Sequence, residues 1–106
     1  MAISYGSKTV RGLQAEVVAW HRGKYPKAYS ADVAVKLGEE VGEVFKAINR
    51  IAFVNRGADP VEIDAMYANL REEIGDVTIV LMVLAERYGL DFAFLLADRI
   101  ETVLER

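Results

Sequence analysis

Two acidic phrases of nearly the same sequence contain the residues of this chain that are best suited to chemistry. They read Leu37-x-Glu39-Glu40-Val41-Gly42-Glu43-Val44 and, thirty-three residues later, Leu70-x-Glu72-Glu73-Ile74-Gly75-Asp76-Val77. Each phrase interrupts a segment that is otherwise apolar at helical spacing, which predicts that some of its carboxylates face the protein interior. Acidic phrases are also common on solvated helix faces, but two copies with an acid in each apolar stripe favour a functional site.

The phase of the two helices predicts which carboxylates meet. With about 100° of rotation per residue, the apolar stripe of each segment contains one glutamate. The stripes read Val33, Leu37, Glu40, Val44, Ile48 and Ile51, and Met66, Leu70, Glu73, Val77, Val80 and Leu84. Glu43 and Asp76 lie one turn beyond Glu40 and Glu73, on the same faces. If the two helices pack antiparallel, four carboxylates gather in a partly buried space.

A divalent cation is the expected occupant of that space. Buried anions lose their hydration, and neighbouring anions repel one another, so the cluster is unfavourable without a cation. All of the expected ligands are carboxylate oxygens, which favours Mg²⁺ or Mn²⁺ over zinc, copper or a histidine-bearing di-iron centre. Glu39 and Glu72 lie at the edge of the same acidic face, where they could be outer-shell ligands, water-orienting groups or a general base.

The elements that position these residues are predicted to be helices, because apolar residues recur at three- and four-residue steps nearly throughout. Ser30 and Asp91 are predicted N-caps, and Asn55-Arg56-Gly57 followed by Asp59-Pro60-x-Glu62 predicts a helix stop and a capping box. Val77-Thr78-Ile79-Val80-Leu81-Met82-Val83 in isolation could be a buried strand, yet the helical spacing continues through it. We therefore predict an all-α antiparallel bundle of about four helices, at residues 8–22, 30–54, 60–88 and 91–106.

Composition narrows the class of protein. We expect one compact domain over residues 1–106, and the hydrophobic content of 53% predicts apolar helix faces that are hidden in a homodimer or homotetramer. The absence of cysteine excludes disulfides, thiolate zinc sites and thiol nucleophiles. A net charge of −3 without a basic run argues against nucleic acid as a partner. Neither a membrane anchor nor a signal peptide is evident in the sequence, so we expect a cytoplasmic protein.

The acidic phrases also resemble the motif of a known family. Glu39-Glu40-Val41-Gly42-Glu43 and Glu73-Ile74-Gly75-Asp76 are similar to the paired E-E-x-x-E and E-x-x-D motif of the MazG-like branch of the all-α nucleoside triphosphate pyrophosphohydrolase superfamily. The resemblance extends from about Ser30 to the C-terminus. It implies an enzyme that cleaves a nucleoside triphosphate to the monophosphate and pyrophosphate, with Mg²⁺ held by Glu40, Glu43, Glu73 and Asp76. We assign the activation of the attacking water to Glu39.

Contacts to the substrate are predicted from three further side chains in the first two helices. Lys36 projects near the acidic face, where it could bind phosphate or pair with the acids. Trp20 and His21, at the end of the first helix, could stack on a base or form a hydrogen bond with it. Trp20 could equally be a core or interface aromatic residue.

The last helix meets the pattern of the resembled family only in part. Arg99 and Arg106 fit its two basic positions, which are expected to bind phosphate, but Val103 stands where the family usually has asparagine. This departure keeps open a non-catalytic helical oligomer that binds nucleotide or metal. A second alternative is an enzyme of the same superfamily that acts on phosphoribosyl-ATP.

Overall fold

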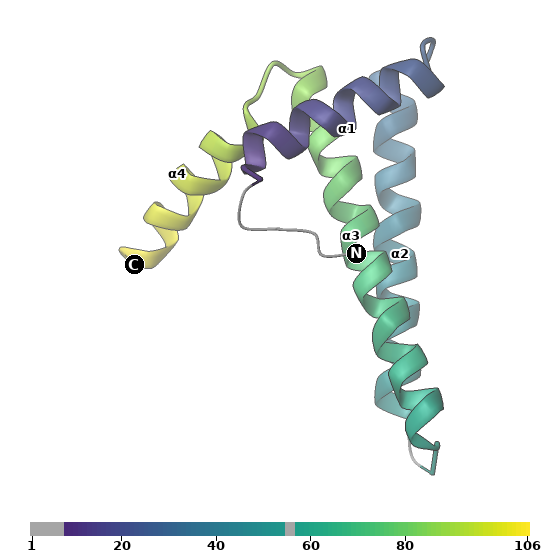
Figure 1. Cartoon of the computed structure of the whole chain (residues 1–106). Helices are drawn as coiled ribbons and strands as arrows, with labels where there is room; N and C mark the ends of the chain where they lie inside the picture. Colours follow the sequence, from purple (N-terminus) through teal and green to yellow (C-terminus); the bar gives the residue numbers. More distant parts are fainter. Residues whose placement is uncertain (1–7, 55–56) are drawn as a thin grey trace. The chain divides into compact units, whose positions relative to one another are not determined.

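Four helices account for nearly all of the chain in the computed structural model, which describes residues 8–54 and 57–106. They are α1 (Val10–Lys24), α2 (Ser30–Val54), α3 (Pro60–Arg87) and α4 (Phe92–Leu104) (Figure 1). The described residues contain no strand, and the β-branched run at 77–83 is helical. The predicted all-α fold is therefore confirmed. Asn55 and Arg56, part of the predicted helix stop, lie outside the described residues.

Local capping chemistry explains where the helices begin. The Asp91 side chain accepts hydrogen bonds from the backbone N–H groups of Ala93 and Phe94, at 3.0 and 3.3 Å. The Asp59 side chain accepts one from the N–H of Glu62 at 2.9 Å. Both carboxylates thereby satisfy donors that the first helical turn leaves unpaired. These two predicted caps are confirmed.

Several boundaries differ from the prediction by about one turn or less, among them the end of α4, which lies at Leu104 and not at residue 106. Helix α1 begins two residues late because Thr9 is its N-cap and accepts a hydrogen bond from the N–H of Gly12 at 3.0 Å. It runs two residues past Arg22, since the N–H of Tyr25 still bonds to the carbonyl of His21 at 2.8 Å. Helix α3 ends at Arg87, ahead of Gly89, whose φ of 71° suits the left-handed turn that follows a helix.

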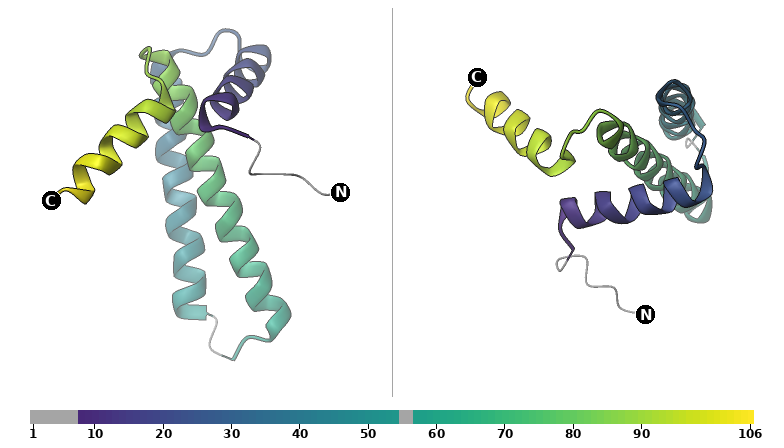
Figure 2. Two further views of the ribbon diagram at one scale, coloured as in Figure 1. Left: turned by 60° about the vertical axis from the view of Figure 1, so that its left-hand side comes forward. Right: turned by 90° about the horizontal axis from the view of Figure 1, so that it is seen from above.

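The chain forms two compact units. The first contains α1, the end of α3 from residue 82, and α4; the second contains residues 31–81, which are the rest of α2 and α3. In the second unit, α2 and α3 run antiparallel side by side (Figure 1, Figure 2). This helical hairpin carries both acidic phrases.

The predicted inner stripes of the hairpin are largely correct. Val33 and Met66 are buried, and the other stripe residues of the hairpin except Ile48 are at least partly buried. Ile48 is 45% exposed, whereas the neighbouring Ala47 is 2% exposed. By helical phase the two residues lie on either side of the stripe centre, and the smaller side chain allows the helices to approach closely. The prediction for Ile48 is therefore wrong.

A buried glutamine ties the first unit together. Gln14 of α1 is 7% exposed, and its Nε2 donates to the carbonyl oxygens of Met82 and Leu90, each at 3.2 Å. Its Oε1 accepts from the N–H of Phe92 at 2.9 Å. One side chain thus links α1 to the end of α3 and to the first residue of α4. Gln14 is not among the residues for which the sequence predicts a role.

An ion pair beside Gln14 makes the stability of the first unit depend on pH. Arg11 Nε donates to Asp91 Oδ2 at 2.8 Å, and this bond is the main cause that holds the pKa of Asp91 below its usual value. The stabilisation is present above the pKa of an unfolded aspartate, about 3.9, and is lost as the pH falls through the lower folded value.

We expect Arg11→Gln to be less stable than the wild type at pH 7. The difference should shrink at pH 3, and denaturant unfolding at both values checks it; an equal difference at both would contradict it.

None of the helices in the described part of the chain is both long enough and apolar enough to cross a bilayer.

Candidate functional site

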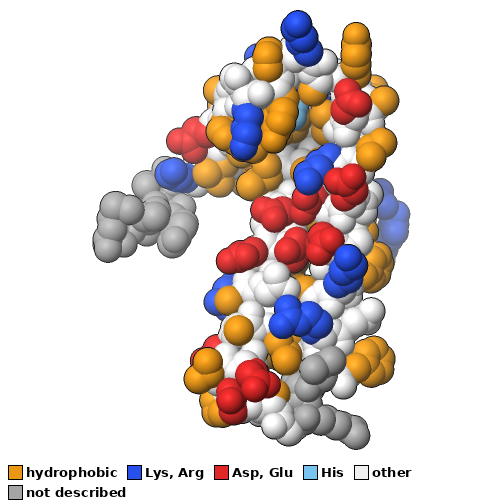
Figure 3. Space-filling model, turned by 90° about the vertical axis from the view of Figure 1, so that its right-hand side faces the viewer, with side chains coloured by type: hydrophobic (Ala, Val, Ile, Leu, Met, Phe, Trp, Pro, Cys, Tyr) orange, Lys and Arg blue, Asp and Glu red, His pale blue; other side chains and the backbone are white. Residues whose placement is uncertain are grey.

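Acidic side chains gather midway along the helical hairpin of the second unit. The face shown in Figure 3 carries a group of Asp and Glu side chains at this level, with Lys and Arg side chains directly beside them. Both acidic phrases contribute, because they lie at matching heights on the antiparallel helices α2 and α3. The hairpin therefore brings together residues that are more than thirty positions apart in sequence.

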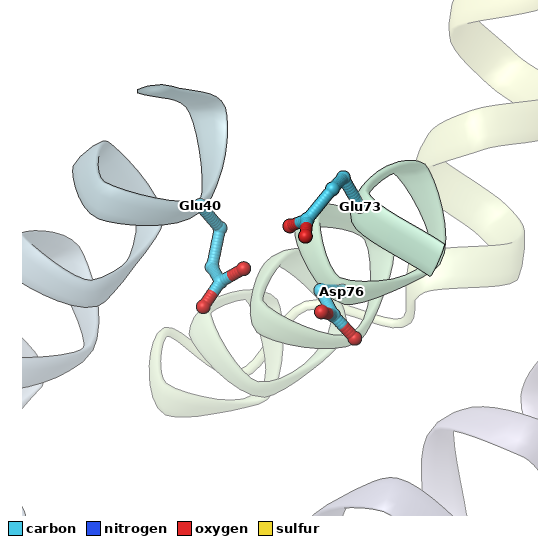
Figure 4. A group of neighbouring side chains, drawn as sticks. All are labelled: Glu40, Glu73 and Asp76. Atoms are coloured by element: carbon cyan, nitrogen blue, oxygen red, sulfur yellow. The ribbon is translucent and has the colours of Figure 1, made fainter. Parts of the chain in front are cut away.

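Three of the four predicted ligand residues meet at this point. Glu40 of α2 and Glu73 and Asp76 of α3 each offer a carboxylate oxygen, and these oxygens all lie within 4.8 Å of one another. Figure 4 shows the Glu40 carboxylate directed from α2 toward the space beside the two acids of α3. Glu40 and Glu73 are half-buried and Asp76 is exposed. We call these three residues the carboxylate cluster.

The cluster is electrostatically strained without a cation. Partial burial, followed by the negative charges of Asp76, Glu43 and Glu40, raises the pKa of Glu73 above its ordinary value. The Asn69 amide, which donates to Glu73 Oε1 at 3.4 Å, opposes this shift. A raised carboxyl pKa means that the site favours an added positive charge, either a proton or a metal ion.

Glu43 lies one turn away from the cluster, and its carboxylate is directed to a lysine. Its Oε1 lies 3.4 Å from Lys46 Nζ, and its side chain is 48% exposed. Its charge still acts on Glu73. The structure therefore places Glu43 near the cluster but not among the three gathered carboxylates, and its role as a ligand stays a prediction.

Lys36 lies beside the cluster and pairs with acids on its own helix. Its Nζ lies 3.0 Å from Glu40 Oε1 and 3.6 Å from Glu39 Oε2. The hydrogen bond to Glu40 is the main cause that raises the pKa of Lys36. Of the two roles considered for Lys36, pairing with the acids is the one present in the structure. Glu39 and Glu72 are both exposed, as expected for the rim of the site.

The residues predicted to contact the base form an aromatic cluster at the end of α1, in the first unit. The Trp20 and His21 rings each contact Tyr25, with centroids 6.3 and 5.2 Å apart, and Lys24 Nζ lies 5.5 Å from the Trp20 centroid. Trp20 is 53% exposed, so it is not a core residue of this chain. Partial burial, followed by the charge of Arg87, lowers the pKa of His21 and so favours the neutral imidazole. The contacts of Lys24 and Tyr25 with Trp20 were not predicted, although both residues follow Trp20 within five positions.

The two C-terminal arginines also belong to the first unit. Arg99 lies in α4, and Arg106 lies beyond its end, where its backbone N–H donates to the carbonyl of Val103 at 3.3 Å. Both side chains are exposed. No described contact joins either arginine to another side chain, so their phosphate-binding role stays a prediction.

Comparison with known proteins agrees with the acidic motif. No curated protein and no solved structure matches the chain significantly. The family model for the MazG nucleotide pyrophosphohydrolase domain matches residues 31–106, a range that contains the carboxylate cluster and all but the first residue of α2. The match coincides with the range over which the acidic motif resembled this family. The chain therefore belongs to the MazG nucleotide pyrophosphohydrolase domain family.

Proposed function

We propose that this protein is a Mg²⁺-dependent nucleoside triphosphate pyrophosphohydrolase, which releases the nucleoside monophosphate and pyrophosphate. The observation that carries the proposal is the carboxylate cluster, whose oxygens lie within 4.8 Å of one another across two helices. The family match over residues 31–106 supports the reaction class. The base and the sugar of the substrate are left to experiment.

The donor atoms of the cluster fit a hard divalent cation. Glu40, Glu73 and Asp76 supply carboxylate oxygens, which Mg²⁺ and Mn²⁺ prefer to imidazole or thiolate. Partial burial, and after it the negative charges of the neighbouring acids, raises the pKa of Glu73, which favours an added cation at the site. When bound there, Mg²⁺ would neutralise phosphate oxygens and lower the pKa of a coordinated water.

Glu39 and the residues predicted to bind the substrate have roles that do not depend on the metal geometry. Glu39 is exposed and lies 3.6 Å from Lys36 Nζ, which holds its carboxylate on the rim near Glu40. From the rim it would orient the attacking water and accept its proton. The predicted contacts of Trp20 and His21 with the base, and of Arg99 and Arg106 with phosphate, remain part of the proposal.

A substrate panel in ¹⁸O-labelled water tests the proposal. The protein is incubated with Mg²⁺ and with ribo- and deoxyribonucleoside triphosphates and phosphoribosyl-ATP, and the released pyrophosphate and orthophosphate are measured separately. Attack at the α-phosphorus would place the label in the monophosphate and none in pyrophosphate. If folded protein releases no pyrophosphate from any compound, or only orthophosphate, the proposal is wrong.

A matched pair of variants tests whether activity depends on the acid in the cluster or on any acid of α3. Asp76→Asn removes a charge from the carboxylate cluster, while Asp64→Asn makes the same change at an exposed position in the same helix. We expect the first to abolish pyrophosphate release and the second to leave it unchanged. Equal activity in both variants would remove Asp76 from the site.

Lys36→Met tests how the lysine acts on the cluster. Lys36 neutralises part of the Glu40 charge and so competes with a metal ion. Because an exposed ion pair contributes little, the variant should need at most about fivefold less Mg²⁺ for half-maximal thermal stabilisation. Melting temperature against Mg²⁺ concentration measures this without reference to activity. A higher Mg²⁺ requirement would show that Lys36 does not compete with the ion.

A further inference from the structure

The aromatic cluster at the end of α1 consists of Trp20, His21 and Tyr25, whose three rings all contact one another. The ring centroids of Trp20 and Tyr25 lie 6.3 Å apart, and the two ring planes are nearly perpendicular, at 88°. The His21 centroid lies 5.2 Å from that of Tyr25 and 6.3 Å from that of Trp20. Trp20 and Tyr25 are 53% and 45% exposed, so a molecule in solution can reach both rings.

The backbone at the end of α1 fixes the position of Tyr25 relative to the helix. His21 and Tyr25 are four residues apart, a spacing that places them on the same side of the helix end. The N–H of Tyr25 donates to the carbonyl of His21 at 2.8 Å, and the carbonyl of Tyr25 accepts from the N–H of Ala28 at 3.2 Å. Pro26 further limits the conformations open to Tyr25. The Tyr25 backbone is therefore ordered before a ligand binds, which lowers the entropic cost of binding.

A positive charge from the chain itself lies over this cluster. Lys24 Nζ is 5.5 Å from the Trp20 centroid and 5.7 Å from the Tyr25 centroid, within the range at which a ring face attracts a cation. No ion pair between described residues involves Lys24. The ammonium group therefore lies at the two rings without a carboxylate to hold it there, which indicates that these rings are a favourable place for a cation.

The third ring adds no fixed positive charge to the cluster. Partial burial, and after it the charge of Arg87, lowers the pKa of His21, which favours the neutral imidazole. Arg87 acts on His21, whereas Lys24 lies over the other two rings. A cationic ligand would therefore gain most over Trp20 and Tyr25, in the place that Lys24 occupies.

From this arrangement we infer that the aromatic cluster selects a nucleotide whose base carries a positive charge, as a purine methylated at a ring nitrogen does. The inference rests on the proposed function for the rest of the substrate and adds the class of base. Such a base is a flat, delocalised cation, which stacks on Trp20 and stands nearly perpendicular to Tyr25. It displaces the ammonium of Lys24, which is exposed and carried on a flexible stem. A neutral base has the same stacking area but lacks the attraction of the charge.

Two methyladenosine isomers test the effect of the charge alone. 1-Methyladenosine is a cation at neutral pH and N6-methyladenosine is neutral, while the methyl group and the sugar are the same. Trp20 is the only tryptophan of the chain, so quenching of its fluorescence reports binding at the cluster. In EDTA, where no metal contributes, we expect 1-methyladenosine to bind at least about fivefold more tightly than N6-methyladenosine. Equal affinities, or no binding of either nucleoside to folded protein, would overturn the inference.

A pair of tyrosine variants tests whether the rings account for this preference. Tyr25→Leu removes one ring face and keeps Trp20 as the probe, so the preference for 1-methyladenosine should fall by about twofold or more. Tyr67→Leu makes the same change at a tyrosine of α3 that is 47% exposed, and it should keep the wild-type preference. Circular dichroism checks that both variants are folded. An equal loss of preference in the two variants would mean that the aromatic cluster is not its source.

Lys24→Gln tests the displacement of the lysine and does not depend on how Tyr25→Leu folds. The variant lacks the charge that competes with a cationic base for the rings and repels it. We expect the preference for 1-methyladenosine to widen by about two- to fivefold. Lys27→Gln, at an exposed position three residues on, controls for the general loss of a positive charge. A preference that narrows in Lys24→Gln alone would show that the lysine does not compete with the base, and would contradict the inference.

Pyrophosphate release distinguishes a failure of this inference from a failure of the proposed function. With Mg²⁺, kcat/KM should be higher for 1-methyladenosine triphosphate than for N6-methyladenosine triphosphate, by about the factor found in binding. If both compounds release pyrophosphate with equal kcat/KM, the proposed function stands and the class of base is wrong. If no triphosphate releases pyrophosphate while 1-methyladenosine still binds more tightly in EDTA, the base site stands and the proposed function is wrong.

Discussion

Glu73→Gln is expected to lower kcat/KM by about 100-fold or more while raising the melting temperature of the metal-free protein. The loss of activity follows because the variant removes a charged ligand from the carboxylate cluster, and metal stabilisation of a transition state is worth several kcal/mol. Glutamine is nearly the same size as glutamate and can still accept the hydrogen bond of Asn69. The variant therefore changes the charge with little change in packing.

The expected gain in stability comes from the removal of an unfavourable negative charge. The folded pKa of Glu73 is raised, so the ionised side chain destabilises the folded state at any pH above that value, and the penalty disappears as the pH falls. Glutamine has no charge at any pH and avoids the penalty. In the absence of metal, the stability advantage of the variant should be present at pH 7 and should diminish in acid.

The two effects are measured separately. Pyrophosphate release gives kcat/KM with saturating Mg²⁺, and thermal unfolding in EDTA at pH 7 and pH 4 gives the stability. Asp64→Asn, at an exposed position of the same helix, is the control for both measurements. A variant whose kcat/KM stays within about threefold of the wild-type value would show that Glu73 is not a ligand. A lower melting temperature in EDTA would show that the cluster is not strained.

Gln14→Met is expected to lower the free energy of unfolding by about 2 kcal/mol or more. Methionine has a similar volume but forms none of the three hydrogen bonds that Gln14 makes with Met82, Leu90 and Phe92. The N–H of Phe92 belongs to the first turn of α4 and has no partner within that helix. A buried polar group that loses its partner costs roughly 1–3 kcal/mol.

Urea unfolding at a fixed protein concentration measures the effect of Gln14→Met, because an oligomer changes its apparent stability with concentration. Glu16→Met introduces the same residue at an exposed position of α1 and should stay within about 0.5 kcal/mol of the wild type. Equal stability of Gln14→Met and the control would show that the glutamine network does not contribute to the fold.

The sequence by itself determined the helices, two of their caps and the position of the acids in the helical stripes. These features are local: the phase of Glu40, Glu73 and Asp76 follows from about 100° of rotation per residue, and the Asp59 and Asp91 caps bond within three residues. The family motif is legible for the same reason, since its carboxylates must recur at helical spacing to share a face. Packing favours the smaller side chain between the helices, which is why Ala47 is buried and Ile48 is exposed.

Only the tertiary structure decided which side chains meet across space. It joined Glu40 to Glu73 and Asp76, and it placed Gln14 against carbonyls that lie more than sixty residues away. Helical phase limits the direction of a side chain, but its rotamer depends on its neighbours, so Glu43 pairs with Lys46 and not with the cluster. For the same reason, the apolar residues of α4 can be read from the sequence, whereas only the folded chain shows that the other helices do not bury them.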